Sequence, residues 1–230
     1  MSGHVERPSS PTYRSRAMSD AQCRRALLVF DLDGTLYRTD SSFVPTMRRV
    51  YEESAVPYPG DAAVLARVGE TFAAFLEWLA PQGFAADPAR LATRISELEL
   101  VSIRERGRLY DEVAETLRTL AGRGHVLALC TNGDRRYAET ILAKFGILDL
   151  FRHLLTVDGP PSTKAQRIAE LRTHYPCCRT FVVGDRYHDV EAGRANQCTV
   201  VGAAYGYAQA GELDGADLIL RSFPEILALV

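Results

Sequence analysis

The 230-residue sequence has no apolar run of about 18 residues or more, which excludes a typical transmembrane helix. Its formal net charge is only −2, so the charge does not predict nucleic acid or an anionic membrane as the main partner. The five cysteines lack paired CxxC spacing, which argues against a structural zinc site and fits free thiols in a reducing cytoplasm. We therefore expect a cytoplasmic protein without nucleic-acid or membrane partners.

The N-terminal segment also lacks the apolar core of a secretory signal. Met1 to Ala17 is rich in Arg, Ser and Pro and has almost no apolar residues, a composition typical of disorder. An organelle transit peptide is the alternative, although its prolines and Glu6 would spoil an amphipathic helix. We expect residues 1–25 to be a disordered, dispensable tail, with the first strand starting near Arg25.

The rest of the chain has the pattern of a globular protein, with 47% hydrophobic residues. Apolar runs without polar alternation predict strands buried on both faces, as in a parallel sheet. These runs are Ala26–Phe30, Val126–Cys130, Thr180–Val183, Cys198–Val201 and Leu218–Leu220, with a weaker one at His153–Val157. Helical patterns at 112–121 and 137–145 separate some of them. This alternation predicts a doubly wound α/β fold with ligands at the carboxyl ends of the strands.

No strand is evident between Arg38 and Arg108. Phe43–Glu53 and Pro88–Ile103 have helical patterns, and the apolar residues from Val64 to Leu79 predict one long helix. A helical block of this length, about 70 residues, is too long for a loop, so we expect a separate all-helical cap over the strand ends. The predicted division is 26–37 and 109–230 for the core and 38–108 for the cap.

The first predicted strand ends in Asp31, Leu32, Asp33, Gly34 and Thr35. Two carboxylates at a strand end can serve one metal and one phosphate. Asp31 can attack phosphorus while its other oxygen binds the cation, and Asp33 can donate a proton to the leaving oxygen. Gly34 and Thr35 let the backbone leave the strand and aim N–H groups at the phosphate. A simple Asx-rich turn is the structural alternative.

With these residues, the chain resembles the haloacid dehalogenase superfamily from about Ala26 to the C-terminus. It looks closest to the phosphoglycolate-phosphatase-like branch, which inserts a helical cap between the first two motifs. The resemblance implies a Rossmann-like core and Mg²⁺-dependent phosphatase chemistry through an aspartyl-phosphate on Asp31. The dehalogenases of the superfamily lack the second aspartate of the motif, so Asp33 favours phosphoryl chemistry.

The resemblance also implies phosphate-binding residues further along the chain. Thr131 and Asn132 follow a buried strand, and the Thr131 hydroxyl and Asn132 N–H would contact the transferring phosphoryl group. Lys164 would neutralise phosphoryl oxygens and hold the nucleophile. Ala165 stands where many members of the family have Pro, and Arg167 is the alternative cation.

The fourth motif of the family matches the sequence from Gly184 to Asp189. Asp185 would be a direct metal ligand, and Asp189 a second ligand or a group that orients Lys164. The resemblance and the acids together predict an Mg²⁺ site formed by Asp31, Asp33, Asp185 and Asp189. The structural alternative is a solvent-facing acidic pair that opens a helix.

The predicted function is the Mg²⁺-dependent hydrolysis of a small phosphate ester, either phosphoglycolate-like, a sugar phosphate or a nucleotide. Three alternatives stay open: a phosphosugar mutase, a 5′-nucleotidase, and a non-catalytic regulator on the same scaffold. Activity on β-phosphosugars without isomerisation would exclude the mutase, and a substrate screen would identify a nucleotidase. Absence of any activity with Mg²⁺ would favour the regulator. The oligomeric state stays open.

Overall fold

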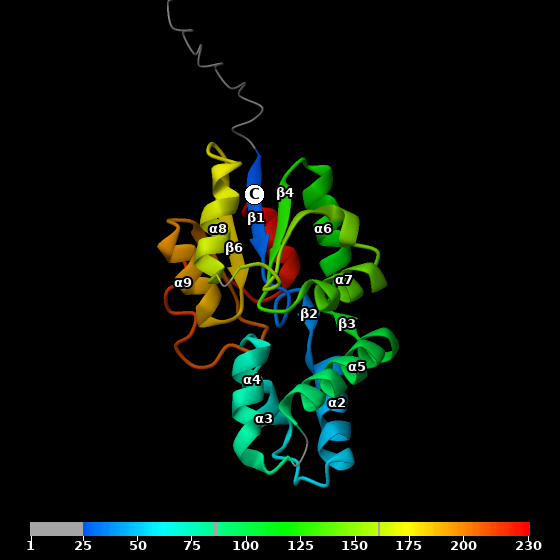
Figure 1. Ribbon diagram of the computed structural model, residues 1–230. Coiled ribbons are helices and arrows are strands. Elements are labelled where there is room, and N and C mark those ends of the chain that lie inside the picture. Colours follow the sequence, from blue (N-terminus) through cyan, green and yellow to red (C-terminus); the bar gives the residue numbers. More distant parts are fainter. Residues whose placement is uncertain (1–24, 85–86, 161) are drawn as a thin grey trace, which may run out of the picture.

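The computed structural model describes residues 25–84, 87–160 and 162–230. The tail predicted at the N-terminus lies outside the described residues, apart from Arg25. Figure 1 shows a central sheet flanked by helices, with a second group of helices at one end of the sheet. No helix in the described part of the chain is long and apolar enough to cross a membrane.

A six-stranded parallel sheet forms the centre of the molecule (Figure 1). In spatial order its strands are β5 (Phe151–Leu155), β4 (Val126–Cys130), β1 (Ala26–Phe30), β6 (Arg179–Gly184), β7 (Thr199–Ala203) and β8 (Leu218–Leu220). Every neighbouring pair is parallel. All five residues of β1 are buried, because the strand lies inside the sheet and between two layers of helices. The predicted doubly wound α/β fold is confirmed.

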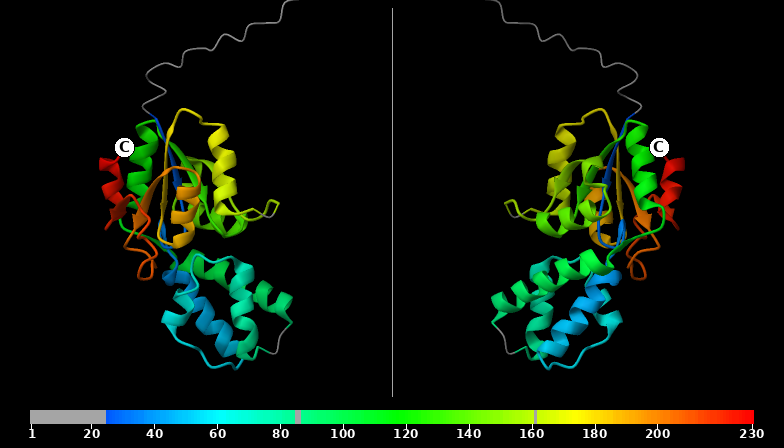
Figure 2. Two further views of the ribbon diagram at one scale, coloured as in Figure 1. Left: turned by 90° about the vertical axis from the view of Figure 1, so that its left-hand side faces the viewer. Right: turned by 90° about the vertical axis from the view of Figure 1, so that its right-hand side faces the viewer.

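The side chains of β1 pack alternately against the helical layers on the two faces of the sheet. Leu28 and Phe30 belong to a buried cluster with residues of α6 (Val113–Gly122), α7 (Arg135–Lys144) and the 3₁₀ helix η3 (Phe223–Ala228). Leu27 and Val29 pack on the other side with α8 (Lys164–Thr173) and α9 (Tyr187–Ala195). Figure 2 shows α8 on one side of the sheet and α6 with η3 on the other. Successive side chains of a strand point to opposite faces of the sheet, so β1 packs against both helical layers.

A second hydrophobic cluster lies in the helices between β1 and β4, which we call the cap. The cap consists of α2 (Asp40–Glu53), α3 (Asp61–Leu65), α4 (Phe72–Leu79), the 3₁₀ turn η1 (Ala80–Gln82) and α5 (Pro88–Arg106). Its cluster includes Met47, Val64, Phe75 and Ile95. In both views of Figure 2 the cap lies beyond the carboxyl end of β1.

The prediction of one long helix from Val64 to Leu79 is wrong. The chain turns between α3 and α4, where Gly69 has a φ of 89° and the Thr71 hydroxyl accepts a hydrogen bond from Ala74 N at 3.3 Å. A left-handed glycine and a new N-cap end one helix and begin another, although the apolar spacing continues across them. We call residues 66–71 the cap turn.

A short ribbon connecting the cap to the core was not predicted. It consists of β2 (Tyr37–Arg38) and β3 (Arg108–Leu109), which pair in antiparallel register. Strands of two residues are too short to show any alternation of apolar and polar side chains, so no sequence pattern indicates them. Lys144 of α7 adds a further connection, because its Nζ donates to Ile103 O of α5 at 2.7 Å.

Candidate active site

Three neighbouring strands bring the predicted site residues to one edge of the sheet. Because β1 pairs in parallel with β4 and β6, the residues that follow these strands emerge together. They are Asp31, Thr131 and Asp185, all of them buried. Lys164 at the start of α8 and Asp189 in the first turn of α9 approach the same point.

Lys164 connects two of the carboxylates. Thr163 and Gln166 form a capping box that begins α8 at Lys164, and the Lys164 Nζ lies 2.7 Å from both Asp31 Oδ1 and Asp189 Oδ1. All three side chains are at most 5% exposed. Burial alone would lower the pKa of Lys164, but the attraction of Asp189 and Asp31 outweighs it and raises the pKa. The ammonium therefore stays charged next to Asp31, and Arg167 does not take its place.

Asp185 is fully buried and held by two donors. Its Oδ2 accepts a hydrogen bond from Tyr207 N at 2.7 Å, and its Oδ1 lies 3.4 Å from the Thr35 hydroxyl. Asp31 differs, because its Oδ2 is buried and meets no hydrogen-bond partner in the described part of the chain. Burying a carboxylate oxygen without a hydrogen-bond donor costs free energy. A ligand or cation bound to Asp31 Oδ2 would offset this cost.

The acids of this site fit a divalent cation. Oxygens of Asp31, Asp185 and Asp189 lie within 4.8 Å of one another. Three carboxylates are balanced by one ammonium, that of Lys164, which leaves excess negative charge in a buried place. Burial and the repulsion of Asp189 raise the pKa of Asp31 to about 7. Carboxylate oxygens suit a hard cation such as Mg²⁺, which would stabilise the ionised form of these acids.

The hydrogen-bond partners of Asp33 differ from those of the other predicted metal ligands. Its Oδ1 accepts hydrogen bonds from the Tyr137 hydroxyl at 2.5 Å and the Thr39 hydroxyl at 2.7 Å. Asp33 does not belong to the group of carboxylates that could hold a metal among the described residues. The metal-binding role predicted for its side chain is therefore not supported. A carboxyl group beside the metal-binding acids, but facing another way, suits an acid/base role better.

The residues after β4 face the same space. Thr131 Oγ1 accepts from Gly133 N at 3.0 Å, which leaves the hydroxyl hydrogen free to be donated to a ligand. Asn132 Nδ2 donates to Gly69 O of the cap turn at 3.0 Å. Arg167 Nη2 donates to Thr131 O and to Asn132 Oδ1, so this arginine supports the loop from behind.

The Gly34 N–H, predicted to face the phosphate, has a backbone partner in this structure. This N–H donates to Tyr37 O at 2.9 Å and is not available to a phosphate. Glycine is required here for another reason, since φ is 78° and a Cβ would lie 2.0 Å from Asp185 Oδ2. The absence of a side chain lets the first motif approach a buried acid of the fourth.

We expect Gly34→Ala to destabilise the protein more than Gly83→Ala does. Both glycines have positive φ, but a Cβ on Gly83 would meet no atom within 4 Å. The shared backbone strain costs about 1 kcal/mol, and the clash at Gly34 adds roughly 2 kcal/mol more. Urea unfolding of the two variants measures this difference. Equal losses of stability would mean that Asp185 moves aside without cost.

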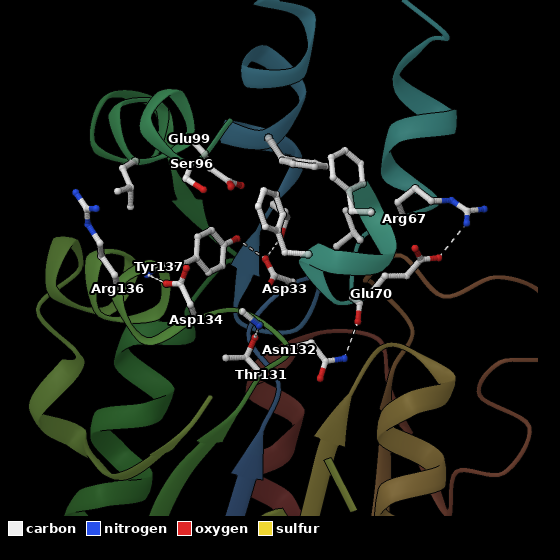
Figure 3. A pocket seen from close by; sticks show the side chains of 18 of the residues that line it. Asp33, Arg67, Glu70, Ser96, Glu99, Thr131, Asn132, Asp134, Arg136 and Tyr137 are labelled. Carbon is white, nitrogen blue, oxygen red and sulfur yellow. Dashed lines mark hydrogen bonds and ion pairs between the residues drawn. The ribbon is translucent and has the colours of Figure 1, made fainter. Parts of the chain in front are cut away.

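A cavity of about 590 Å³ lies between these residues and the cap (Figure 3). From the core, Asp31, Asp33 and Thr131 line it, while the cap contributes the cap turn and residues of α2, α4 and α5. Tyr137, Thr39 and Glu99 also line this cavity, and sequence reasoning missed them. No motif marks these three residues, because only the folded chain brings their separate segments together.

A contact from the loop after β6 also holds the cap turn against the core. Arg186, which follows Asp185, contacts Val68 O and pairs with Glu212 at 2.7 Å. Together with the bond from Asn132 to Gly69 O, this contact closes one wall of the cavity. The core and the cap are therefore in direct contact at the predicted reaction site.

Comparison with known proteins defines the class to which this fold and site belong. The model of the haloacid dehalogenase-like hydrolases matches residues 26–196, and the chain belongs to this family. The resemblance inferred from the motifs is thereby confirmed.

The relatives lie in the branch that the motifs indicated. The chain is 30% identical over 204 residues to a phosphoglycolate phosphatase of Haemophilus influenzae, covering 79% of this chain and 86% of that protein. A phosphoglycolate phosphatase of Mannheimia succiniciproducens is 28% identical over 221 residues, covering 89% and 97%. Among solved structures, a predicted phosphoglycolate phosphatase from Haemophilus somnus superposes with a TM-score of 0.79 at 25% identity, covering 89% and 97%.

Proposed function

We propose that the protein is a phosphatase that hydrolyses small phosphate monoesters through an aspartyl-phosphate on Asp31. The observation that carries the proposal is the difference between the two oxygens of this carboxylate. One oxygen is held by Lys164 at 2.7 Å, while the other is buried and has no hydrogen-bond partner among the described residues, and an Asp31 oxygen lies within 4.8 Å of an Asp185 oxygen. The family and the phosphatases among its relatives support the same reaction class.

In the first step, Asp31 attacks phosphorus. A bond forms between the carboxylate oxygen and phosphorus, while the bond between phosphorus and the ester oxygen breaks. Asp33 gives its proton to the departing oxygen. Burial raises the pKa of Asp33, which favours the protonated acid, whereas hydrogen bonds from Tyr137 and Thr39 favour the carboxylate. These opposing effects suit a group that must both give and take a proton.

In the second step, Asp33 takes a proton from water, and the oxygen of this water attacks phosphorus. The bond between phosphorus and Asp31 breaks, which releases inorganic phosphate and restores the carboxylate. The Lys164 ammonium and the Thr131 hydroxyl stabilise phosphoryl oxygens through both steps. Mg²⁺, bound by Asp31 and Asp185 with Asp189 nearby, would supply positive charge that offsets the phosphoryl oxygens.

The remaining features fit this role. The cap covers the cavity and limits access of bulk water to the acyl phosphate. Cys130 and Cys198 are buried thiols outside any disulfide, which supports a reducing, cytoplasmic location. The substrate that we propose is a small molecule, since the cavity holds about 590 Å³.

A panel of phosphate monoesters, assayed for inorganic phosphate with and without Mg²⁺, tests the proposal. We expect turnover with Mg²⁺, loss of turnover in excess chelator, and recovery when Mg²⁺ is restored, because all the proposed ligands are oxygens. Full activity in excess chelator would contradict the metal assignment. Failure to release phosphate from any ester would overturn the proposed function.

A further inference from the structure

The part of the cavity beyond Asp33 has a distinctive composition. Three aromatic rings of the cap line it, those of Phe43, Phe72 and Phe75, and the centroids of Phe43 and Phe75 lie 5.2 Å apart. Figure 3 shows Glu99 of α5 reaching into the same space, above Asp33. A leaving group attached to a phosphoryl group at Asp31 would extend between these rings and this carboxylate.

Glu99 has no hydrogen-bond or ion-pair partner among the described residues, although it is partly buried and lines the cavity. Burial raises the pKa of Glu99 to about 8, and repulsion from Asp33 and Asp134 contributes. The raised pKa means that the ionised form of Glu99 is unfavourable here without a partner. A ligand that donates a hydrogen bond to it would satisfy this group.

No cation of the described residues balances Glu99. Arg67 lines the cavity but pairs with Glu70 at 3.0 Å. Arg136 is exposed at the rim, and Figure 3 shows both arginines pointing away from Asp33. Lys164 is already held by Asp31 and Asp189. A carboxylate on the leaving group would therefore meet no positive partner here and could be accommodated only with Glu99 protonated, whereas a donor would bind its ionised form.

We propose that the leaving group of the substrate carries a hydrogen-bond donor, an ammonium or a hydroxyl group, that Glu99 accepts. This inference rests on the proposed function and specifies its substrate class. It separates this chain from what the name phosphoglycolate phosphatase indicates for its relatives, since a glycolate leaving group carries a carboxylate. The aromatic rings would cover the carbon skeleton of the donor and, for an ammonium, add cation–π attraction.

Four esters of nearly equal size test the inference: 2-aminoethyl phosphate, 2-hydroxyethyl phosphate, ethyl phosphate and phosphoglycolate. We expect kcat/KM of the better donor ester to exceed that of phosphoglycolate by at least about 10-fold, the effect of one hydrogen bond to a charged group. Ethyl phosphate should lie between them. If kcat/KM relative to ethyl phosphate rises more for 2-aminoethyl phosphate than for 2-hydroxyethyl phosphate, the donor is an ammonium. Similar rises for the two esters indicate a hydroxyl group.

Glu99→Gln removes the charge and keeps the shape. We expect the ratio of kcat/KM between the donor ester and phosphoglycolate to fall about 10-fold in this variant. Glu105→Gln is the matched control, because Glu105 is an exposed residue of the same helix that does not line the cavity. Its ratio should equal that of the wild type. Thermal melting shows whether the variants fold, and the wild-type order of substrates tests the inference without them.

Two negative results have different meanings. If p-nitrophenyl phosphate is hydrolysed but phosphoglycolate is the best of the four esters, and Glu99→Gln leaves the ratio unchanged, the inference on Glu99 is wrong and the phosphatase proposal stands. If neither p-nitrophenyl phosphate nor any of the four esters is hydrolysed, the proposed function fails and the inference fails with it.

Discussion

Asp31→Asn is expected to lower kcat by more than about 10⁴-fold, because an amide is a poor nucleophile and the first step needs a free carboxylate oxygen. Asp31 Oδ2 is buried and has no hydrogen-bond partner among the described residues, whereas Asp185 accepts from Tyr207 N and Asp189 is held by Lys164. Steady-state phosphate release with Mg²⁺ measures the loss. Near-native turnover would exclude Asp31 as the nucleophile.

Asp33→Asn provides the comparison, since it changes a neighbouring aspartate of the same motif in the same way. We expect a loss of about 10²–10⁴-fold, the usual effect of removing an acid/base group. This loss should be smaller for p-nitrophenyl phosphate in the first step, because p-nitrophenolate leaves without protonation. A loss as large as that of Asp31→Asn in the first step would assign both residues to nucleophilic attack.

Lys164→Met should have the largest effect on stability together with a severe loss of activity. The ammonium is the common partner of Asp31 and Asp189 at 2.7 Å, and its removal leaves two buried carboxylates unpaired. Breaking such a buried pair costs about 3–5 kcal/mol. Urea unfolding in the presence of chelator measures this cost without a contribution from bound metal.

Lys144→Met is the matched control for this substitution. The Lys144 Nζ donates to the carbonyl oxygens of Ile103 and Arg104, and it forms no ion pair with any of the residues that the structure describes. Its loss should cost only about 1 kcal/mol, the value of an ordinary hydrogen bond, and leave the active site unchanged. Similar losses in the two variants would contradict a special role of the buried Lys164 network.

Sequence patterns predicted the core of this fold because its strands are buried on both faces. β1, β4 and β6 appear as apolar runs that end in polar residues, and parallel pairing then brings these ends together. The positions of Asp31, Thr131 and Asp185 at one edge follow from that pairing alone. Lys164 and Asp189 were located by the resemblance, and the structure brings both into contact with this group.

The remainder depended on information that no periodic pattern contains. The apolar spacing from Val64 to Leu79 continues through a turn, so Gly69 and Thr71 were not recognised as a break. The direction of the Asp33 side chain is determined by Tyr137 and Thr39, whose hydroxyl groups reach it only in the folded chain.

Glu99 illustrates the same limit in the cap. Its helix was predicted from apolar spacing, but the spacing does not tell which polar residue of α5 faces the core. That orientation depends on how α5 packs against the core, for example through the hydrogen bond from Lys144 to Ile103 O. The proposed selection of the leaving group by Glu99 would therefore depend on tertiary contacts between the cap and the core.

Phosphate trapping on Asp31 tests the central claim most directly. Asp33→Asn protein is mixed with p-nitrophenyl phosphate and Mg²⁺, quenched in acid, and analysed by intact mass and by mapping of the phosphorylated peptide. We predict a burst of p-nitrophenolate and one phosphoryl group on Asp31, because the first step needs no proton for this leaving group whereas hydrolysis of the intermediate needs a base. Protein carrying Asp31→Asn as well should trap nothing. Phosphate on another residue, or equal trapping by the double variant, would contradict the account.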